Sequence, residues 1–160
     1  MIFEMAMARF FTTDLFTNPQ RRPSGNTPFM SKSRKIVYVS PSKALCEERF
    51  EDWSKRLADM DLGIEIATVT GDGDPSDAFR DFASAHVVLT TPEKWDSLTR
   101  RWTENFVLFA SVKLFMLDEV HLVADDSRGC CLESVVCRMK TIHRAARNCE
   151  LSQADIDTSR

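Results

Sequence analysis

The residues best suited to chemistry are Asp118, Glu119 and His121, which follow the apolar run 112–117. A short apolar stretch that ends in two carboxylates is typical of a buried parallel strand, which delivers them to the sheet edge where α/β proteins bind ligands. One carboxylate there can hold Mg²⁺ through water, and its neighbour can orient an attacking water, as nucleoside triphosphate hydrolysis requires. Asp-Glu also closes many ordinary strands in a solvated turn, so the pair alone leaves both interpretations open.

Two further segments place hydroxyl groups and a lysine where a strand turns into a helix. They are Ser40-Pro41-Ser42-Lys43 and Thr90-Thr91-Pro92-Glu93-Lys94. Backbone N–H groups at a helix start attract phosphate, although simple N-capping explains either segment alone. If the strands are parallel, both segments emerge at the same edge as Asp118. This coincidence favours a nucleic-acid strand that crosses the edge beside a nucleotide.

The elements that must position these residues alternate between strand and helix. Strands are predicted at 35–39, 64–69, 86–89 and 112–117, and helices at 42–58, 76–83, 92–102 and 132–147. A helical periodicity is present in residues 2–11. Three of the six prolines lie in residues 12–34, which predicts a disordered insertion there. A frayed tail is predicted at the end of the chain, in residues 151–160. The alternation predicts an α/β fold with a parallel sheet flanked by helices.

Composition limits the class of protein. The 160 residues are 43% hydrophobic, which is enough for one globular domain. A net charge of −3 provides no global basic field, so any contact with nucleic acid has to come from a local surface. The five cysteines form no CxxC pair and predict reduced thiols of an intracellular protein. No apolar run reaches membrane-spanning length, so no membrane contact is predicted, and no feature predicts a homo-oligomer.

In chain order, four segments resemble motifs of the superfamily 2 DExH helicases. They are Pro41-Ser42-Lys43-Ala44-Leu45, Thr70-Gly71-Asp72, Thr90-Thr91-Pro92-Glu93-Lys94-Trp95-Asp96 and Asp118-Glu119-Val120-His121. The chain resembles the Ski-two-like branch, and the stretches 91–102, 117–123 and 126–129 are most similar to the meiotic crossover DNA helicases of the Mer-three type. The resemblance covers about residues 1–11 and 35–147. It implies a nuclear, ATP-driven motor of two RecA-like domains that translocates along single-stranded or branched DNA and unwinds it.

The resemblance also implies roles for individual residues. Asp118 would hold Mg²⁺ through water, Glu119 would activate the water that attacks ATP, and His121 would relay the nucleotide state to the nucleic-acid edge. A histidine that merely pairs with a neighbouring backbone group remains an alternative for His121. The contacts with the tracking strand would come from Ser40, Lys43, Thr70, Gly71, Thr91 and Lys94. Gly71 is explained equally well by a turn.

Other residues favour structural interpretations. Trp95 lies within a predicted helix and fits a core position better than a base-stacking platform. Arg100 and Arg101 could touch the strand, but exposed helix arginines usually face solvent. The basic residues of the last helix, among them Arg138 and Arg144, predict a solvated face.

One motif of the family is absent from these residues. The family has a glycine-rich phosphate loop of the form G-x-x-x-x-G-K-[ST], and the sequence contains none. Residues 1–6 resemble the helix after this loop, so residues 1–150 are expected to form a partial first domain that lacks the loop and a central strand, and whose partner is the missing remainder of the helicase. We expect no ATPase activity from this chain alone. An inactive nucleic-acid-binding or regulatory fragment, and an RNA helicase of the same branch, remain alternatives.

Overall fold

The computed structural model describes residues 34–59, 63–71 and 74–158. Its centre is a four-stranded parallel sheet, as predicted, with the strand order β2-β3-β1-β4. The strands are β1 (Lys35–Val39), β2 (Ile66–Val69), β3 (Val87–Thr90) and β4 (Val112–Leu117). The helix expected at 2–11 lies outside the described residues, as does the insertion expected at 12–34 except for Arg34.

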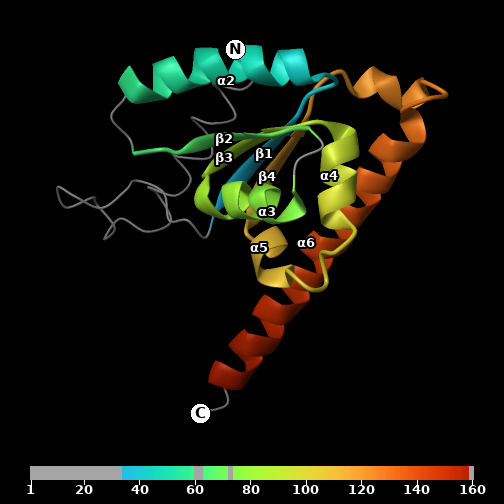
Figure 1. The fold of residues 1–160 in the computed structure, drawn as a ribbon. Coiled ribbons are helices and arrows are strands. Elements are labelled where there is room, and N and C mark those ends of the chain that lie inside the picture. Colours follow the sequence, from blue (N-terminus) through green and yellow to red (C-terminus); the bar gives the residue numbers. More distant parts are fainter. Residues whose placement is uncertain (1–33, 60–62, 72–73, 159–160) are drawn as a thin grey trace.

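Helices cover both faces of this sheet (Figure 1). Their bounds are α2 (Lys43–Asp59), α3 (Pro75–Ser84), α4 (Pro92–Thr99), α5 (Phe106–Ala110) and α6 (Gly129–Thr158), with a 3₁₀ helix, η1, at Val120–Ala124. One face of the sheet packs on α2, and the opposite face packs on α3, α4, α5 and α6. Within the described ranges no helix is both long and apolar enough to cross a membrane.

Alternation along the strands builds a core on each face. In β1, Ile36 and Tyr38 pack toward α2, whereas Val37 and Val39 join the cluster on the opposite face. This period of two follows from the pleat of a strand. Trp95 of α4 is fully buried at the centre of the second cluster, with its ring centroid 5.2 Å from that of Phe82. The expected core position of Trp95 is therefore confirmed.

The strand that carries the acidic pair lies at an edge of the described sheet. β1 pairs on both sides, with β3 and β4, so the described strands show no central gap where one was expected. β4 pairs only with β1 in this sheet, and most of its side chains are half-buried rather than buried. The apolar sequence of β4 predicts a buried strand, whereas the described residues pair it on one side only.

The last helix is longer than the sequence predicts. It was expected at 132–147 with a frayed tail at 151–160, and α6 instead runs from Gly129 to Thr158. Residues 148–158 contain neither glycine nor proline, so no helix breaker ends it near 147. The helix α5 was not predicted, because its five residues are too few for a periodic pattern.

Candidate nucleic-acid interface

The parallel register brings three strand ends to one edge of the sheet. Val39 of β1 lies opposite Thr90 of β3 and Leu117 of β4. Beyond the strands, the Ser40 N–H donates to the Thr90 carbonyl at 2.9 Å, and the Asp118 N–H donates to the Val39 carbonyl at 2.9 Å. The predicted meeting of the two helix starts and the acidic pair at one carboxyl edge is therefore confirmed.

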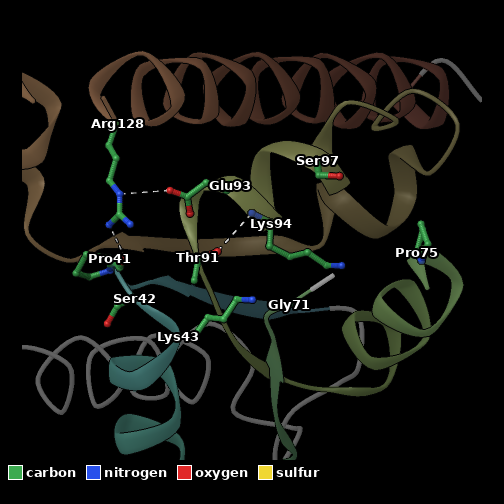
Figure 2. Close-up of a pocket in the computed structure, with 10 residues that line it drawn as sticks. All are labelled: Pro41, Ser42, Lys43, Gly71, Pro75, Thr91, Glu93, Lys94, Ser97 and Arg128. Carbon is green, nitrogen blue, oxygen red and sulfur yellow. Dashed lines mark hydrogen bonds and ion pairs between the residues drawn. The ribbon is translucent and has the colours of Figure 1, made fainter. Parts of the chain in front are cut away.

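An open groove of about 630 Å³ lies at this edge, between the starts of α2 and α4 (Figure 2). Its volume falls within the range of about 300–1,000 Å³ that is usual for ligand sites. It is lined by Pro41, Ser42, Lys43, Gly71, Pro75, Thr91, Glu93, Lys94, Ser97 and Arg128. Four separate connections of the chain supply these residues, namely those after β1, β2, β3 and η1, as expected for a site built on loops at the carboxyl edge of a parallel sheet.

Four of the six residues predicted to contact a strand line this groove: Lys43, Gly71, Thr91 and Lys94. Two do not. Ser40 is fully buried, because it continues β1 into the core, and Ser42 lines the groove in its place. Thr70 is half-buried and lies outside the groove lining.

Local capping and turn chemistry position the groove residues. Thr91 is the N-cap of α4, where its hydroxyl oxygen accepts from the Lys94 N–H at 3.4 Å, and Pro92 follows. Gly71 has φ of +97°, a left-handed conformation that glycine adopts readily, which supports the interpretation of a turn. A Cβ at Gly71 would lie 4.0 Å from Lys43 Nζ, so the turn and the lysine are neighbours.

The sequence did not indicate two charged residues of the groove, Glu93 and Arg128. Arg128 Nη1 donates to the Pro41 carbonyl at 2.6 Å, and Arg128 Nε lies 3.5 Å from Glu93 Oε1 (Figure 2). Pro41 and Arg128 are 87 residues apart, so no spacing rule connects them. The groove therefore contains three cations and one carboxylate, and the carboxylate is paired.

The acidic pair lies at the same edge but outside the groove lining. Asp118 Oδ1 accepts from the Glu119 N–H at 3.0 Å, and its Oδ2 accepts from the Tyr38 hydroxyl. Burial, followed by this hydrogen bond and the charge of Asp118, raises the pKa of Tyr38 above its usual value. The phenol therefore stays protonated and holds the Asp118 carboxylate in one orientation.

Glu119 and His121 are exposed and pair with each other. Glu119 has φ of +50°, in the left-handed region that is strained for a residue with a Cβ, where the chain turns from β4 into η1. His121 Nδ1 lies 3.1 Å from Glu119 Oε2, so the histidine partner is this carboxylate rather than a backbone group.

The donors at the acidic pair suit a hard cation bound through water. Carboxylate oxygens are the ligands that Mg²⁺ prefers, and it commonly keeps several waters. The described residues include no cluster of three or more histidine, cysteine or acidic side chains that would hold a metal directly. Asp118 therefore fits a water-mediated contact, whereas the sequence contains no glycine-rich phosphate loop to bind a triphosphate.

An ion pair fixes α4, which carries Thr91 and Lys94, against α6. Arg138 Nη1 donates to Asp96 Oδ1 at 2.7 Å and to Thr99 Oγ1 at 2.8 Å. The prediction that Arg138 belongs to a solvated face is wrong, because its side chain turns toward α4 and is only 21% exposed. Arg100 also donates to the Asp96 carboxylate, so this arginine forms an ion pair within the α4 region.

Comparison with known proteins agrees with this geometry. The model of the DEAD/DEAH box helicase family matches residues 10–152. The matched residues include the whole described sheet, the groove and the Asp-Glu pair, which agrees with a helicase domain of the RecA-like type. The chain belongs to the DEAD/DEAH box helicase family.

Named relatives lie within this family. The probable ATP-dependent DNA helicase HFM1 of Homo sapiens is 47% identical over 113 residues, which are 71% of this chain and 8% of that protein. The ATP-dependent DNA helicase MER3 of Saccharomyces cerevisiae is 35% identical over 125 residues, 76% of this chain and 10% of that protein. The chain thus spans about a tenth of the length of these relatives. Both relatives are ATP-dependent DNA helicases by name, and the name MER3 agrees with the Mer-three type that the sequence resembled.

A solved structure shares the fold. The crystal structure of the DUF1998 helicase MrfA bound to DNA and AMPPNP matches with a TM-score of 0.62 and 25% identity. The match covers 72% of this chain and 16% of that one. It supports the assignment of the sheet and its helices to a helicase domain.

Proposed function

We propose that this chain is part of the first RecA-like domain of a nuclear ATP-dependent DNA helicase of the meiotic type. Its own task would be to hold one strand of single-stranded or branched DNA in the groove. The observation that carries this proposal is the convergence of Lys43, Lys94 and Arg128 with two helix N-termini on one groove. HFM1 and MER3 are DNA helicases by name, which supports DNA as the substrate.

The groove would bind the sugar-phosphate backbone rather than the bases. Lys43 and Lys94 would each neutralise one phosphate, and the N–H groups at the start of α2 and α4 would bind phosphate oxygens. Gly71 would let the strand approach the turn after β2 closely. Such contacts position a strand without reading its sequence, so binding is expected to be independent of sequence.

The acidic pair would serve the nucleotide side of the motor. Asp118, oriented by Tyr38, would hold a Mg²⁺ water, Glu119 would orient the attacking water, and His121, paired with Glu119, would relay the nucleotide state. When bound, Mg²⁺ neutralises charge on the transferred phosphoryl group. ATP turnover would require the phosphate loop and second domain of the remaining helicase, which is the partner that we propose.

The proposal is tested by the binding of fluorescent single-stranded oligodeoxynucleotides, measured by anisotropy across a salt series. We expect a weak affinity, about 10⁻⁴–10⁻⁶ M, which falls steeply with salt because the contacts are to phosphates. Lys43→Ala and Lys94→Ala should each weaken binding for every sequence and flatten the salt slope by about one. Arg144→Ala, an exposed cation of α6, is the matched control and should do neither. Unchanged binding in both lysine variants, with a loss in Arg144→Ala, would place the strand elsewhere.

A second measurement concerns catalysis by this chain alone. Without a glycine-rich loop the phosphates lose a nest of N–H donors and a lysine, so no nucleic-acid-stimulated ATP hydrolysis is expected. Turnover above background that disappears in Glu119→Gln would contradict this, since it would reveal another phosphate site.

A further inference from the structure

Arg128 reaches the groove from a different part of the chain than the two lysines. Its guanidinium bridges both helix starts, because Pro41 precedes α2 and Glu93 lies in the first turn of α4. Figure 2 shows the side chain extending down to Pro41 beside Glu93. Arg128 therefore contacts both helix starts that border the groove, and it lies on the path proposed for the nucleic-acid strand.

The turn before α6 is built to present this arginine. The Asp125 carboxylate accepts from the Ser127 N–H at 2.8 Å and from the Arg128 N–H at 3.2 Å. The hydrogen bonds from Ser127, with a smaller effect of Arg128, lower the pKa of Asp125, so that it stays charged. A Cβ at Gly129 would lie 2.2 Å from the Val123 carbonyl oxygen, so the backbone passes where no side chain fits. Backbone packing therefore sets the position of Arg128.

Glu93 poses an electrostatic problem for a groove that binds a polyanion. Its carboxylate lines the groove and would repel a phosphate. Arg128 compensates this charge, yet the two groups are 3.5 Å apart and about half-exposed, which is a weak pairing. In contrast, the bond of Arg128 to the Pro41 carbonyl is short, at 2.6 Å. A guanidinium has five N–H donors in a planar fork, so it can keep Pro41 and bind a phosphate at the same time.

We propose that Arg128 is a phosphate-binding residue of the groove, and that it exchanges Glu93 for a backbone phosphate when a strand enters. The proposal rests on the proposed function, namely that a nucleic-acid strand lies in this groove. Glu93 would then turn into solvent, toward which its side chain is already 53% exposed. Because Arg128 belongs to the segment that follows Asp118 and Glu119, the strand would contact that segment as well as the two helix starts.

The test separates direct phosphate binding from mere neutralisation of Glu93. Binding of a labelled oligothymidylate is measured for Arg128→Ala in two backgrounds, the unchanged chain and Glu93→Gln. If Arg128 binds a phosphate, its loss should weaken binding about tenfold in the Glu93→Gln background, the size of one charge-assisted hydrogen bond, and at least as much in the unchanged chain, where Glu93 is also left uncompensated. The salt slope should also fall by about one in both. If Arg128 only compensates Glu93, the loss will vanish in the Glu93→Gln background, and the proposal is overturned.

Two further variants complete the design. Arg56→Ala is the matched control, because Arg56 is an exposed arginine paired with Asp52 on α2 and lies outside the groove lining. It should leave affinity and salt slope unchanged. Arg128→Gln removes the charge but keeps a donor for the Pro41 carbonyl, so it decides the question if Arg128→Ala fails to fold. It should show the same loss of slope, and an unchanged slope would refute the phosphate contact.

The lysine variants distinguish the two proposals. If Lys43→Ala and Lys94→Ala weaken binding while both Arg128 variants leave it intact, only this inference fails. If the unchanged chain binds no oligonucleotide, the proposed function fails, and the role of Arg128 fails with it.

Discussion

Replacing Arg138 by alanine is expected to destabilise the chain by about 2–3 kcal/mol. Breaking a fully buried ion pair by removing one partner typically costs about 3–5 kcal/mol, because a charge is left uncompensated. The pair of Arg138 and Asp96 is only part-buried, with side chains that are 21% and 11% exposed, which lowers the expected cost. Here Asp96 keeps a second partner, since Arg100 Nη2 lies 2.7 Å from its Oδ2, so the loss should be smaller. It should still exceed the effect of one neutral hydrogen bond, about 1 kcal/mol, because Arg138 Nη1 also donates to Thr99 Oγ1 at 2.8 Å.

The measurement is urea unfolding followed by tryptophan fluorescence, for which buried Trp95 is a reporter beside the pair. A slope of about 1–3 kcal/mol per molar urea converts the expected loss into a midpoint lower by about 0.7–3 M. Arg144→Ala on the same helix is the control, because that residue is exposed and should change the free energy of unfolding by less than about 0.5 kcal/mol. The reasoning is refuted if Arg138→Ala is no more destabilising than Arg144→Ala.

The same pair predicts a dependence on pH. Burial by itself would raise the pKa of Asp96, but the hydrogen bonds from Arg138 and Arg100 outweigh it and hold the pKa below the usual value. A carboxyl with a lowered folded-state pKa contributes its stability above the unfolded value of about 4 and loses it as the pH falls through the folded value. The difference in the free energy of unfolding between the unchanged chain and Arg138→Ala should therefore be largest at pH 7. It should become smaller as acid protonates Asp96.

Two further predictions concern packing and the sheet edge. Gly129→Ala should lower the free energy of unfolding by about 1–3 kcal/mol, because its Cβ would lie 2.2 Å from the Val123 carbonyl oxygen, and an unchanged thermal midpoint would contradict this. Among the described residues β4 pairs on one side only, and this edge should make the chain self-associate on concentration, which sedimentation would detect as a mass above that of the monomer. Val107→Lys replaces an apolar side chain that is 83% exposed on α5, and loss of self-association in this variant would assign the association to that apolar side chain instead of the strand edge.

Much of the fold is predictable because its signals are local. The run 35–39 is β-branched and aromatic and stops at Ser40-Pro41, and β1 is found at Lys35–Val39. The strand predicted at 112–117 is found with the same bounds, and α4 begins at Pro92 as expected from the Thr91 cap. Once these strands are parallel, their carboxyl ends must share one edge. The common location of Lys43, Lys94 and Asp118 could therefore be inferred without any tertiary contact.

The parts that could not be predicted depend on the direction of single side chains or on distant contacts. Ser40 and Ser42 look alike in the sequence, but the pleat of β1 continues through Ser40 and buries it, while Ser42 lies beyond the strand and lines the groove. Arg138 has the spacing of a solvated helix position, and only the approach of α4 gives it Asp96 as a partner, 42 residues away in the chain.

Arg128 shows why the charge of a binding groove is harder to predict than its location. A lysine in the first turn of a helix is placed by the helix itself, so its position follows from the pattern that starts the helix. Arg128 instead lies in the turn between η1 and α6, and its position depends on the Asp125 hydrogen bonds and on the close backbone contact at Gly129. Because Arg128 pairs with Glu93, it also decides whether that carboxylate repels a phosphate. The net charge that the groove presents to a phosphate therefore depends on the contact between Arg128 and Glu93. These residues belong to distant segments, so no local sequence pattern predicts their contact.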